Sequence, residues 1–150
     1  GARALGGRSI LADPRQPGVR DQVNAKIKYR ENFRPFAPAI LAESAPFYFH
    51  DGARMSPYMT LATRTDGDHY LGATDHMGTA RVQTVPADGS PFRKLLEAWR
   101  DLSGCPALLN TSFNLKGQPI VESPRDALMT FAGCGLDALV IGNFVVEKRG

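Results

Sequence analysis

A basic stretch near the start of the chain contains the residues best suited to bind anions. Lys28, Arg30 and Arg34 stand close together, and Arg3 and Arg8 precede them. Lysine and arginine side chains offer only donors, and the planar guanidinium group can bind two phosphate oxygens at once. Several such groups in one pocket would hold a phosphorylated substrate. A run of charge is also typical of a solvated helix face, and the residues alone leave both interpretations open.

The basic charge is concentrated in this stretch. Residues 1–34 hold eight basic and three acidic side chains, although the whole chain of 150 residues has a formal net charge of only +3. A nucleic-acid-binding face usually has more basic charge overall, with aromatic side chains between the cations, and here only Tyr29 and Phe33 are so placed. The pattern favours a local site for small anions and disfavours nucleic acid as the partner.

A second polar cluster, Asn110-Thr111-Ser112-Phe113-Asn114, follows a short apolar run. Loops at the ends of strands are common ligand sites. The amides and hydroxyls of the cluster supply both donors and acceptors, as recognition of a carbonyl and a phosphate requires. The alternative is an ordinary turn, because Asn, Ser and Thr form such turns unaided.

Other candidate chemistries give weaker patterns. Cys105 and Cys134 form no CxxC pair and the three His are scattered, which argues against a metal site or a disulfide and favours a reducing, cytoplasmic compartment. The glycines of residues 1–9 are spaced as in a phosphate-binding loop, but the loop's lysine and its preceding strand are missing. No apolar run approaches the roughly 18–20 residues that span a bilayer, so no membrane partner is expected.

The elements that must position these residues follow a mixed pattern. Helices are predicted over residues 19–31, over residues 91–103 after the N-cap Ser90, and from the N-cap Ser123 to Gly133 or Gly135. Strands are predicted at residues 58–63, 70–74, 81–85, 107–109 and 137–148, the last interrupted by Gly142. Pro35 and Pro38 predict that residues 33–41 form an extended or edge segment and not a central strand. The sequence therefore predicts one α+β or mixed α/β domain over residues 1–150.

Several of these stretches also occur together, in one order, in a known family. They resemble the C-terminal region of the O-carbamoyltransferases that modify antibiotics and nodulation factors. The matching stretches include Arg3-Ala4-Leu5-Gly6, Lys28-Tyr29-Arg30, Arg34-Pro35-Phe36-Ala37-Pro38, Gly78-Thr79-Ala80-Arg81, Asn110-Thr111-Ser112-Phe113-Asn114 and Leu136-Asp137. The family usually has Gly-Pro-Arg at Gly1-Ala2-Arg3 and His-Val-Asp at Asp75-His76-Met77, so no role is transferred to Asp75 or His76.

The resemblance implies a fold and an activity. The fold would be similar to YrdC: a twisted open α/β sheet with flanking helices and a basic concave cleft. The implied reaction uses carbamoyl phosphate and ATP with Mg²⁺ to make carbamoyl-adenylate. A separate N-terminal domain, which this chain does not contain, would then pass the carbamoyl group to a substrate hydroxyl. The alternatives are a non-catalytic nucleotide- or RNA-binding module, or a domain that only docks against its N-terminal partner.

The resemblance also implies roles for individual residues. It pairs the Lys-x-Arg signature with a later Ser-x-Asn, and it implies no metal ligands in this chain. The implied catalytic residues are Lys28, Arg30 and Arg34. The residues implied to bind carbamoyl phosphate are Arg3, Lys28, Arg34 and Arg81, and those implied to bind the nucleotide are Arg30, Asn110, Ser112 and Asn114.

Overall fold

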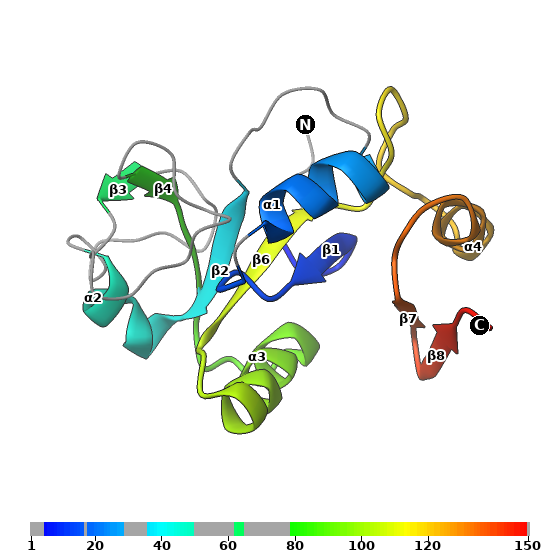
Figure 1. Ribbon diagram of the computed structural model, residues 1–150. Coiled ribbons are helices and arrows are strands. Elements are labelled where there is room, and N and C mark those ends of the chain that lie inside the picture. Colours follow the sequence, from blue (N-terminus) through cyan, green and yellow to red (C-terminus); the bar gives the residue numbers. More distant parts are fainter. Residues whose placement is uncertain (1–4, 17, 29–35, 50–61, 65–78, 150) are drawn as a thin grey trace.

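A four-stranded mixed sheet lies at the centre of the molecule (Figure 1). The computed structural model describes residues 5–16, 18–28, 36–49, 62–64 and 79–149. The strand order is β1-β6-β2-β5, in which β6 is antiparallel to both of its neighbours and β2 is parallel to β5. The strands are β1 (Ser9–Ala12), β6 (Ala107–Ser112), β2 (Ala37–Leu41) and β5 (Gln83–Val85).

Helices cover both faces of this sheet, as Figure 1 shows. On one face, α3 (Pro91–Ser103) packs its Leu96, Phe92 and Trp99 against apolar strand residues such as Leu41 and Leu108. On the other face, α1 (Val19–Gln22) continues directly into a π-helix, η1 (Val23–Lys28). Val23, Phe36 and Leu109 form the core beneath that second helix. Most of the sheet is therefore buried between these helices.

Local sequence signals explain where the two longer helices begin and end. The Ser90 hydroxyl accepts a hydrogen bond from the Arg93 N–H, and Gly104 ends α3 in the left-handed conformation with a φ of 75°. The Ser123 hydroxyl caps α4 (Pro124–Ala132) in the same way. In the part of the chain that the structure describes, no helix is long and apolar enough to cross a membrane.

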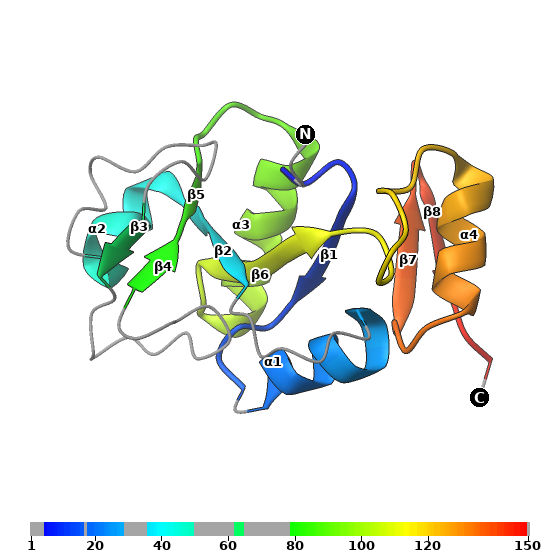
Figure 2. The same cartoon turned by 90° about the horizontal axis from the view of Figure 1, so that it is seen from above.

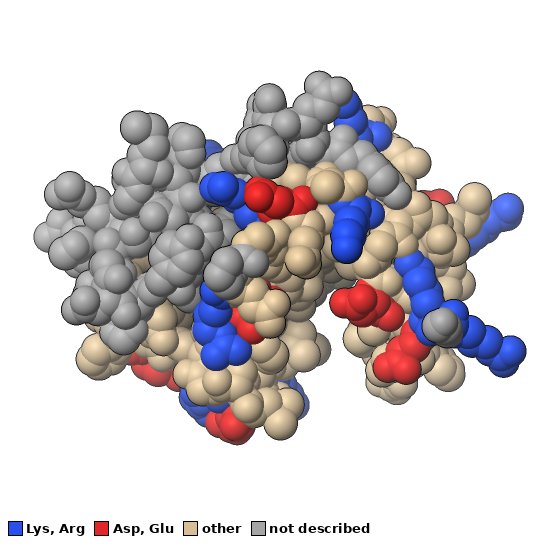
Figure 3. All heavy atoms as spheres, viewed as in Figure 1, with Lys and Arg blue, Asp and Glu red and all other residues tan. Residues whose placement is uncertain are grey.

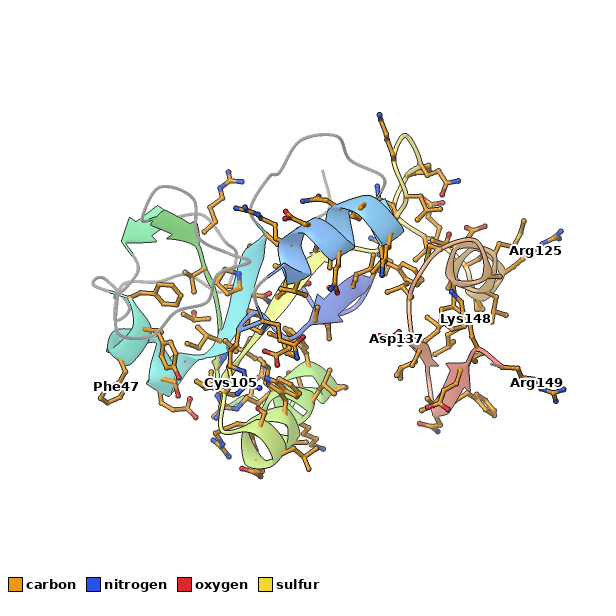
Figure 4. The ribbon with its side chains drawn as sticks, viewed as in Figure 1. Phe47, Cys105, Arg125, Asp137, Lys148 and Arg149 are labelled. Carbon is orange, nitrogen blue, oxygen red and sulfur yellow. The ribbon has the colours of Figure 1, made fainter. Side chains whose placement is uncertain are left out.

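A C-terminal unit lies beside β1 (Figure 2). It consists of α4 and an antiparallel hairpin of β7 (Ala138–Ile141) and β8 (Phe144–Glu147). An apolar cluster that includes Ile10, Phe113 and Leu139 joins this unit to the sheet. Figure 4 shows Lys148 between α4 and the hairpin, where its ammonium group donates to the Cys134 carbonyl.

Smaller elements lie at the opposite edge of the sheet. A second strand pair joins β3 (Ala62–Arg64) to β4 (Thr79–Arg81), and β4 leads through the fully buried Val82 into β5. A 3-10 turn, η2 (Ala42–Ser44), and a short helix, α2 (Ala45–Tyr48), follow β2.

The mixed α/β class and the open sheet confirm the sequence prediction. The prediction that residues 33–41 form no central strand was wrong for Ala37–Leu41, and residues 33–35 lie outside the described residues. β2 is an interior strand, flanked by β6 and β5. Pro38 is tolerated there because the pairing with β5 begins only at Ala39, one residue later, so the missing N–H falls outside that ladder.

Other strand boundaries also differ from the prediction. Residues 110–112 are not a turn, because β6 continues through them and pairs with β1 as far as Ser112. Residues 81–85 are divided between β4 and β5. The interruption predicted at Gly142 is confirmed, since it separates two strands within residues 137–148. The turn between those two strands contains Gly142, whose φ of 55° suits a tight hairpin connection. The helix predicted over residues 19–31 is helical through residue 28, and residues 29–31, 58–61 and 70–74 lie outside the described residues.

Candidate functional site

The ammonium group of Lys28 lies at the end of β6 and is surrounded by oxygens. It donates to the carbonyl and hydroxyl oxygens of Ser112 at 2.8 and 3.1 Å. It also donates to the carbonyl and side-chain oxygens of Asn114 at 2.9 and 2.6 Å. Only 1% of Lys28 is exposed. A buried charge needs such partners, since burying it unpaired costs several kcal/mol.

The partners of Lys28 are themselves fixed in orientation. The Ser112 hydroxyl donates to the Asn114 side-chain oxygen at 2.6 Å, and the Asn114 amide donates to the Gln118 carbonyl at 2.8 Å. Ser112 and Asn114 both remain partly accessible. The two side chains implied to bind the nucleotide therefore have defined orientations before any ligand arrives.

Two elements that are distant in the sequence produce this arrangement. Lys28 is the last residue of η1, and Ser112 is the last residue of β6. Val23 packs against Leu109 of β6, so the helix end is held close to the strand end. π-helical turns are rare and occur frequently at functional sites.

A second polar contact crosses the sheet from β6 to β5. The Asn110 amide donates to the Gln83 side-chain oxygen at 2.8 Å, and both residues are buried. The two side chains meet above β2, where their paired residues are Ala37 and Ala39. Alanines at those positions leave room for the contact. The Gln83 amide also lies 3.5 Å from the Leu5 carbonyl, so it connects the sheet to the N-terminal loop.

The N-terminal loop, residues 5–8, is anchored beside the same strand end. The Phe113 N–H donates to the Arg8 carbonyl at 3.0 Å, and the Arg8 guanidinium donates to the Val121 carbonyl at 3.3 Å. Gly6 has a φ of 100°, and a Cβ at that position would lie 2.5 Å from the Phe92 ring. Glycine is therefore required there both by its backbone conformation and by the close approach to α3.

An ion-pair network holds the far end of β5. The Arg93 guanidinium donates to the Val85 carbonyl at 2.8 Å and binds both Glu43 and Glu97. Arg93 is buried, whereas Glu43 is half exposed. The hydrogen bond from Arg93 holds the pKa of Glu43 below its ordinary value of 4.5, and the two carboxylates raise the pKa of Arg93. This network fixes the strand on which Gln83 lies.

The structure brings some of the expected site residues together and separates others. Lys28 is in direct contact with Ser112 and Asn114, the two residues of the Ser-x-Asn stretch that the resemblance pairs with Lys-x-Arg. Asn110 lies two residues before Ser112 on β6. Arg81 is exposed at the end of β4, two residues before Gln83. Arg3, Arg30 and Arg34 lie outside the described residues.

Gln83 is a site residue that the sequence reasoning missed. Its signals in the sequence were a polar pair between Val82 and Val85 and its place in the stretch 78–85, which resembles the family but to which no role was assigned at Gln83. Among the residues that the structure describes, no three His, Cys, Asp or Glu side chains gather as metal ligands would. The cluster around Lys28 thus places a buried positive charge behind the partly accessible side chains of Ser112 and Asn114, with an arginine-containing loop beside it.

Comparison with known proteins shows the family of this chain. The model of the family described as "Carbamoyltransferase C-terminus" matches residues 1–148. The nodulation protein NolO of Bradyrhizobium diazoefficiens is 46% identical to this chain, and the match covers 99% of the chain and 28% of NolO. The 3'-hydroxymethylcephem-O-carbamoyltransferase of Amycolatopsis lactamdurans is 37% identical over 95% of the chain and 28% of that enzyme.

A third relative gives the same proportions. The nodulation protein NolNO of Sinorhizobium fredii is 44% identical over 99% of the chain and 23% of its own length. The chain thus spans about a quarter of the curated relatives that it matches. With a family match over nearly its whole length, this chain belongs to the carbamoyltransferase C-terminus family.

Proposed function

We propose that this chain takes part in carbamoyl transfer, and that its own step is the formation of carbamoyl-adenylate from carbamoyl phosphate and ATP. Membership of the family supports carbamoyl transfer in general. The observation that carries the finer proposal is the contact of Lys28 with Ser112 and Asn114 at the end of β6, beside the loop of Arg8. A cation, a hydroxyl and an amide converge there at a partly accessible strand end.

The proposed chemistry asks for charge stabilisation more than for covalent catalysis. Water cleaves carbamoyl phosphate to carbamate and phosphate, a carbamate oxygen attacks the α-phosphorus of ATP, and pyrophosphate leaves. Negative charge builds up on phosphoryl oxygens in the transition state, so fixed cations and donors lower the barrier. Mg²⁺ would arrive with ATP and stay bound mainly to its phosphates, since Mg²⁺ keeps several waters and needs few protein carboxylates.

The position of each residue suggests its role in this reaction. Lys28 holds the Ser112–Asn114 turn in place, and a phosphate oxygen would reach its ammonium group by replacing one of the carbonyl acceptors. Ser112 and Asn114 orient the nucleotide, and Asn110, held by Gln83, supports them from within the sheet. We assign Arg3, Arg30, Arg34 and Arg81 to the phosphates of the two substrates. The acceptor hydroxyl belongs to a further substrate, and the N-terminal domain that would bind that substrate belongs to the longer protein.

The test is Lys28→Gln in the longer protein that contains this chain. The matched control is Lys26→Gln, since Lys26 is an exposed lysine of the same π-helix. We expect Lys28→Gln to reduce carbamoyl-phosphate-dependent pyrophosphate release from ATP by roughly a hundredfold or more, the loss that follows removal of one transition-state charge contact. Lys26→Gln should keep its activity, and circular dichroism should show that both variants are folded.

Two results would contradict the proposal. Normal pyrophosphate release by folded Lys28→Gln would exclude the assigned role of Lys28. Binding of ATP or RNA without any pyrophosphate release in the unmodified protein would instead favour a non-catalytic module. Affinity for RNA would then fall steeply with salt, with a slope set by the number of phosphates contacted.

A further inference from the structure

An apolar groove of about 700 Å³ runs between the central sheet and the C-terminal unit. Figure 3 shows the hollow between α3 and the β7–β8 hairpin. Its walls include β1, β7, α3 and the N-terminal loop, and Arg8 and Glu122 are the only charged residues among the described ones that line it. The groove is thus distinct from the polar cluster around Lys28, although residues 6–8 border both.

The two strands that border this groove are both sheet edges. Within the part of the chain that the structure describes, β1 pairs only with β6 and β7 only with β8. In Figures 1 and 2, β7 is the hairpin strand nearer to β1. Native proteins cover or blunt their strand edges, since the free N–H and C=O groups can pair with any other strand.

The alternation of hydrogen-bonded pairs along each strand shows which backbone groups face the groove. Arg8 and Phe113 form a hydrogen-bonded pair, and such pairs alternate along an antiparallel ladder, so Ser9 and Leu11 direct their backbone groups away from β6.

The same alternation applies to the hairpin. A two-residue turn makes Ile141 and Phe144 a hydrogen-bonded pair, so Ala138 and Val140 direct their backbone groups away from β8. All four outward-directed residues, Ser9, Leu11, Ala138 and Val140, line the groove.

Apolar side chains are also left exposed along this groove. Val140 is 69% exposed and Leu95 is 47% exposed, and both line it. Exposed apolar side chains grouped at a strand edge are typical of a surface that another segment covers. A charged or polar ligand would find few partners there, whereas an extended apolar segment would find backbone partners on both sides.

We propose that this groove receives one β-strand, which pairs with β1 and β7 at once and joins the two sheets. The occupant is an extended segment, apolar at alternate positions, from the part of the longer protein that precedes residue 1. Two observations favour that source. The family match describes a C-terminal region, and it covers only 28% of NolO and 23% of NolNO, so most of each relative lies outside it. The loop that leads into β1 forms part of the groove wall.

The test compares this chain alone with a chain that carries an added segment. About twenty residues that precede the matched region of NolO, enough for one strand and its connection, are placed before Gly1. We expect amide hydrogen exchange at Ser9, Leu11, Ala138 and Val140 to slow by roughly ten- to a hundredfold, as one or two added backbone hydrogen bonds would produce. Trp99, the single tryptophan of the chain, lines the groove, and its fluorescence emission should shift to shorter wavelength.

A matched pair of proline variants tests whether the added segment pairs with the free edge of β7. Val140 and Val145 face each other in the hairpin and are similarly exposed, but only Val140 lines the groove. Val140→Pro in the extended chain should abolish the added protection of β7, whereas Val145→Pro should retain it. If amide exchange at the four outward-directed residues is the same with and without the added segment, the proposal is overturned whatever the two variants show. Protection that appears in the unextended chain and rises with its concentration would also overturn it, because a second copy would then occupy the groove.

Discussion

At the scale of single residues, Lys28 shows how a charge can be buried without weakening the fold. Its ammonium group meets oxygens of both Ser112 and Asn114, so the desolvation of the charge is offset by charge-assisted hydrogen bonds. The same contacts fix the Ser112 and Asn114 side chains. A lysine in this position thus contributes to the geometry of the proposed site even before it meets a phosphate.

Gly6 is the residue at which the N-terminal loop is most tightly constrained. We predict that Gly6→Ala lowers the free energy of unfolding by roughly 1–3 kcal/mol, because an added Cβ would collide with Phe92 in a backbone conformation that alanine rarely adopts. The neighbouring glycine is the control. Gly7 has open space around it, so Gly7→Ala should change the stability by less than about 1 kcal/mol.

Urea denaturation followed by circular dichroism would compare these two variants. Equal stabilities for Gly6→Ala and Gly7→Ala would mean that the loop does not pack on Phe92 in solution.

At the scale of elements, Arg93 connects α3 to β5 and to the segment that follows β2. We predict that Arg93→Met lowers the free energy of unfolding by about 2 kcal/mol, since a buried network of charged hydrogen bonds and the bond to the Val85 carbonyl are lost together. Arg100→Met is the control on the same helix. Arg100 is more exposed, lies 4.0 Å from Glu43 and pairs at 3.2 Å with the exposed Asp101, so its loss should cost less than about 1 kcal/mol.

Thermal and urea unfolding of both arginine variants would measure this difference. Similar losses of stability in the two variants would contradict the role of the Arg93 network in holding β5, and would indicate that Arg93 acts only as a surface charge. Amide exchange in β5 should also accelerate in Arg93→Met and remain unchanged in Arg100→Met.

The elements that could be predicted from the sequence are those specified by neighbouring residues. Ser90 and Ser123 were predicted as caps and both accept the expected backbone N–H, because a helix start depends on a few consecutive positions. The strand positions depended on distant partners. The segment of β2 was predicted as an extended or edge segment because of Pro35 and Pro38, but pairing with β5 makes it an interior strand. β6 was predicted to stop at residue 109, but pairing with β1 extends it to Ser112.

The contacts of the candidate site also depend on residues that are distant in the sequence, so the sequence could predict them only in part. Residue types indicated two polar clusters, and the resemblance to a family paired Lys28 with Ser112 and Asn114, but nothing in their spacing brings residue 28 next to residue 112. That contact requires η1 to pack on β6. Gln83 was missed because its role depends on Asn110 lying two strands away, across small alanines that no local pattern connects.

At the scale of the whole molecule, the acidic side chains set how stability responds to pH. Hydrogen bonds from Arg93 and Arg15 hold the pKa values of Glu43 and Asp13 below their ordinary values of 4.5 and 3.8. The N–H of Ser90 does the same for the pKa of Asp88. These carboxylates therefore ionise more readily in the folded chain than in the unfolded one.

The sign of the pH dependence follows from these lowered pKa values. The unfolded chain binds more protons in acid, so the stability that these groups contribute is complete above their ordinary pKa values and is lost as the pH falls through the folded-state values. We predict that the free energy of unfolding changes little from about pH 7 to about pH 5.5 and then declines towards about pH 3. Glu43→Gln should make that decline shallower, because its side chain no longer titrates, and this change should be visible below about pH 5.5. Urea denaturation at each pH would measure the slopes, and identical slopes in the wild type and in Glu43→Gln would show that the pair of Glu43 with Arg93 does not form in solution.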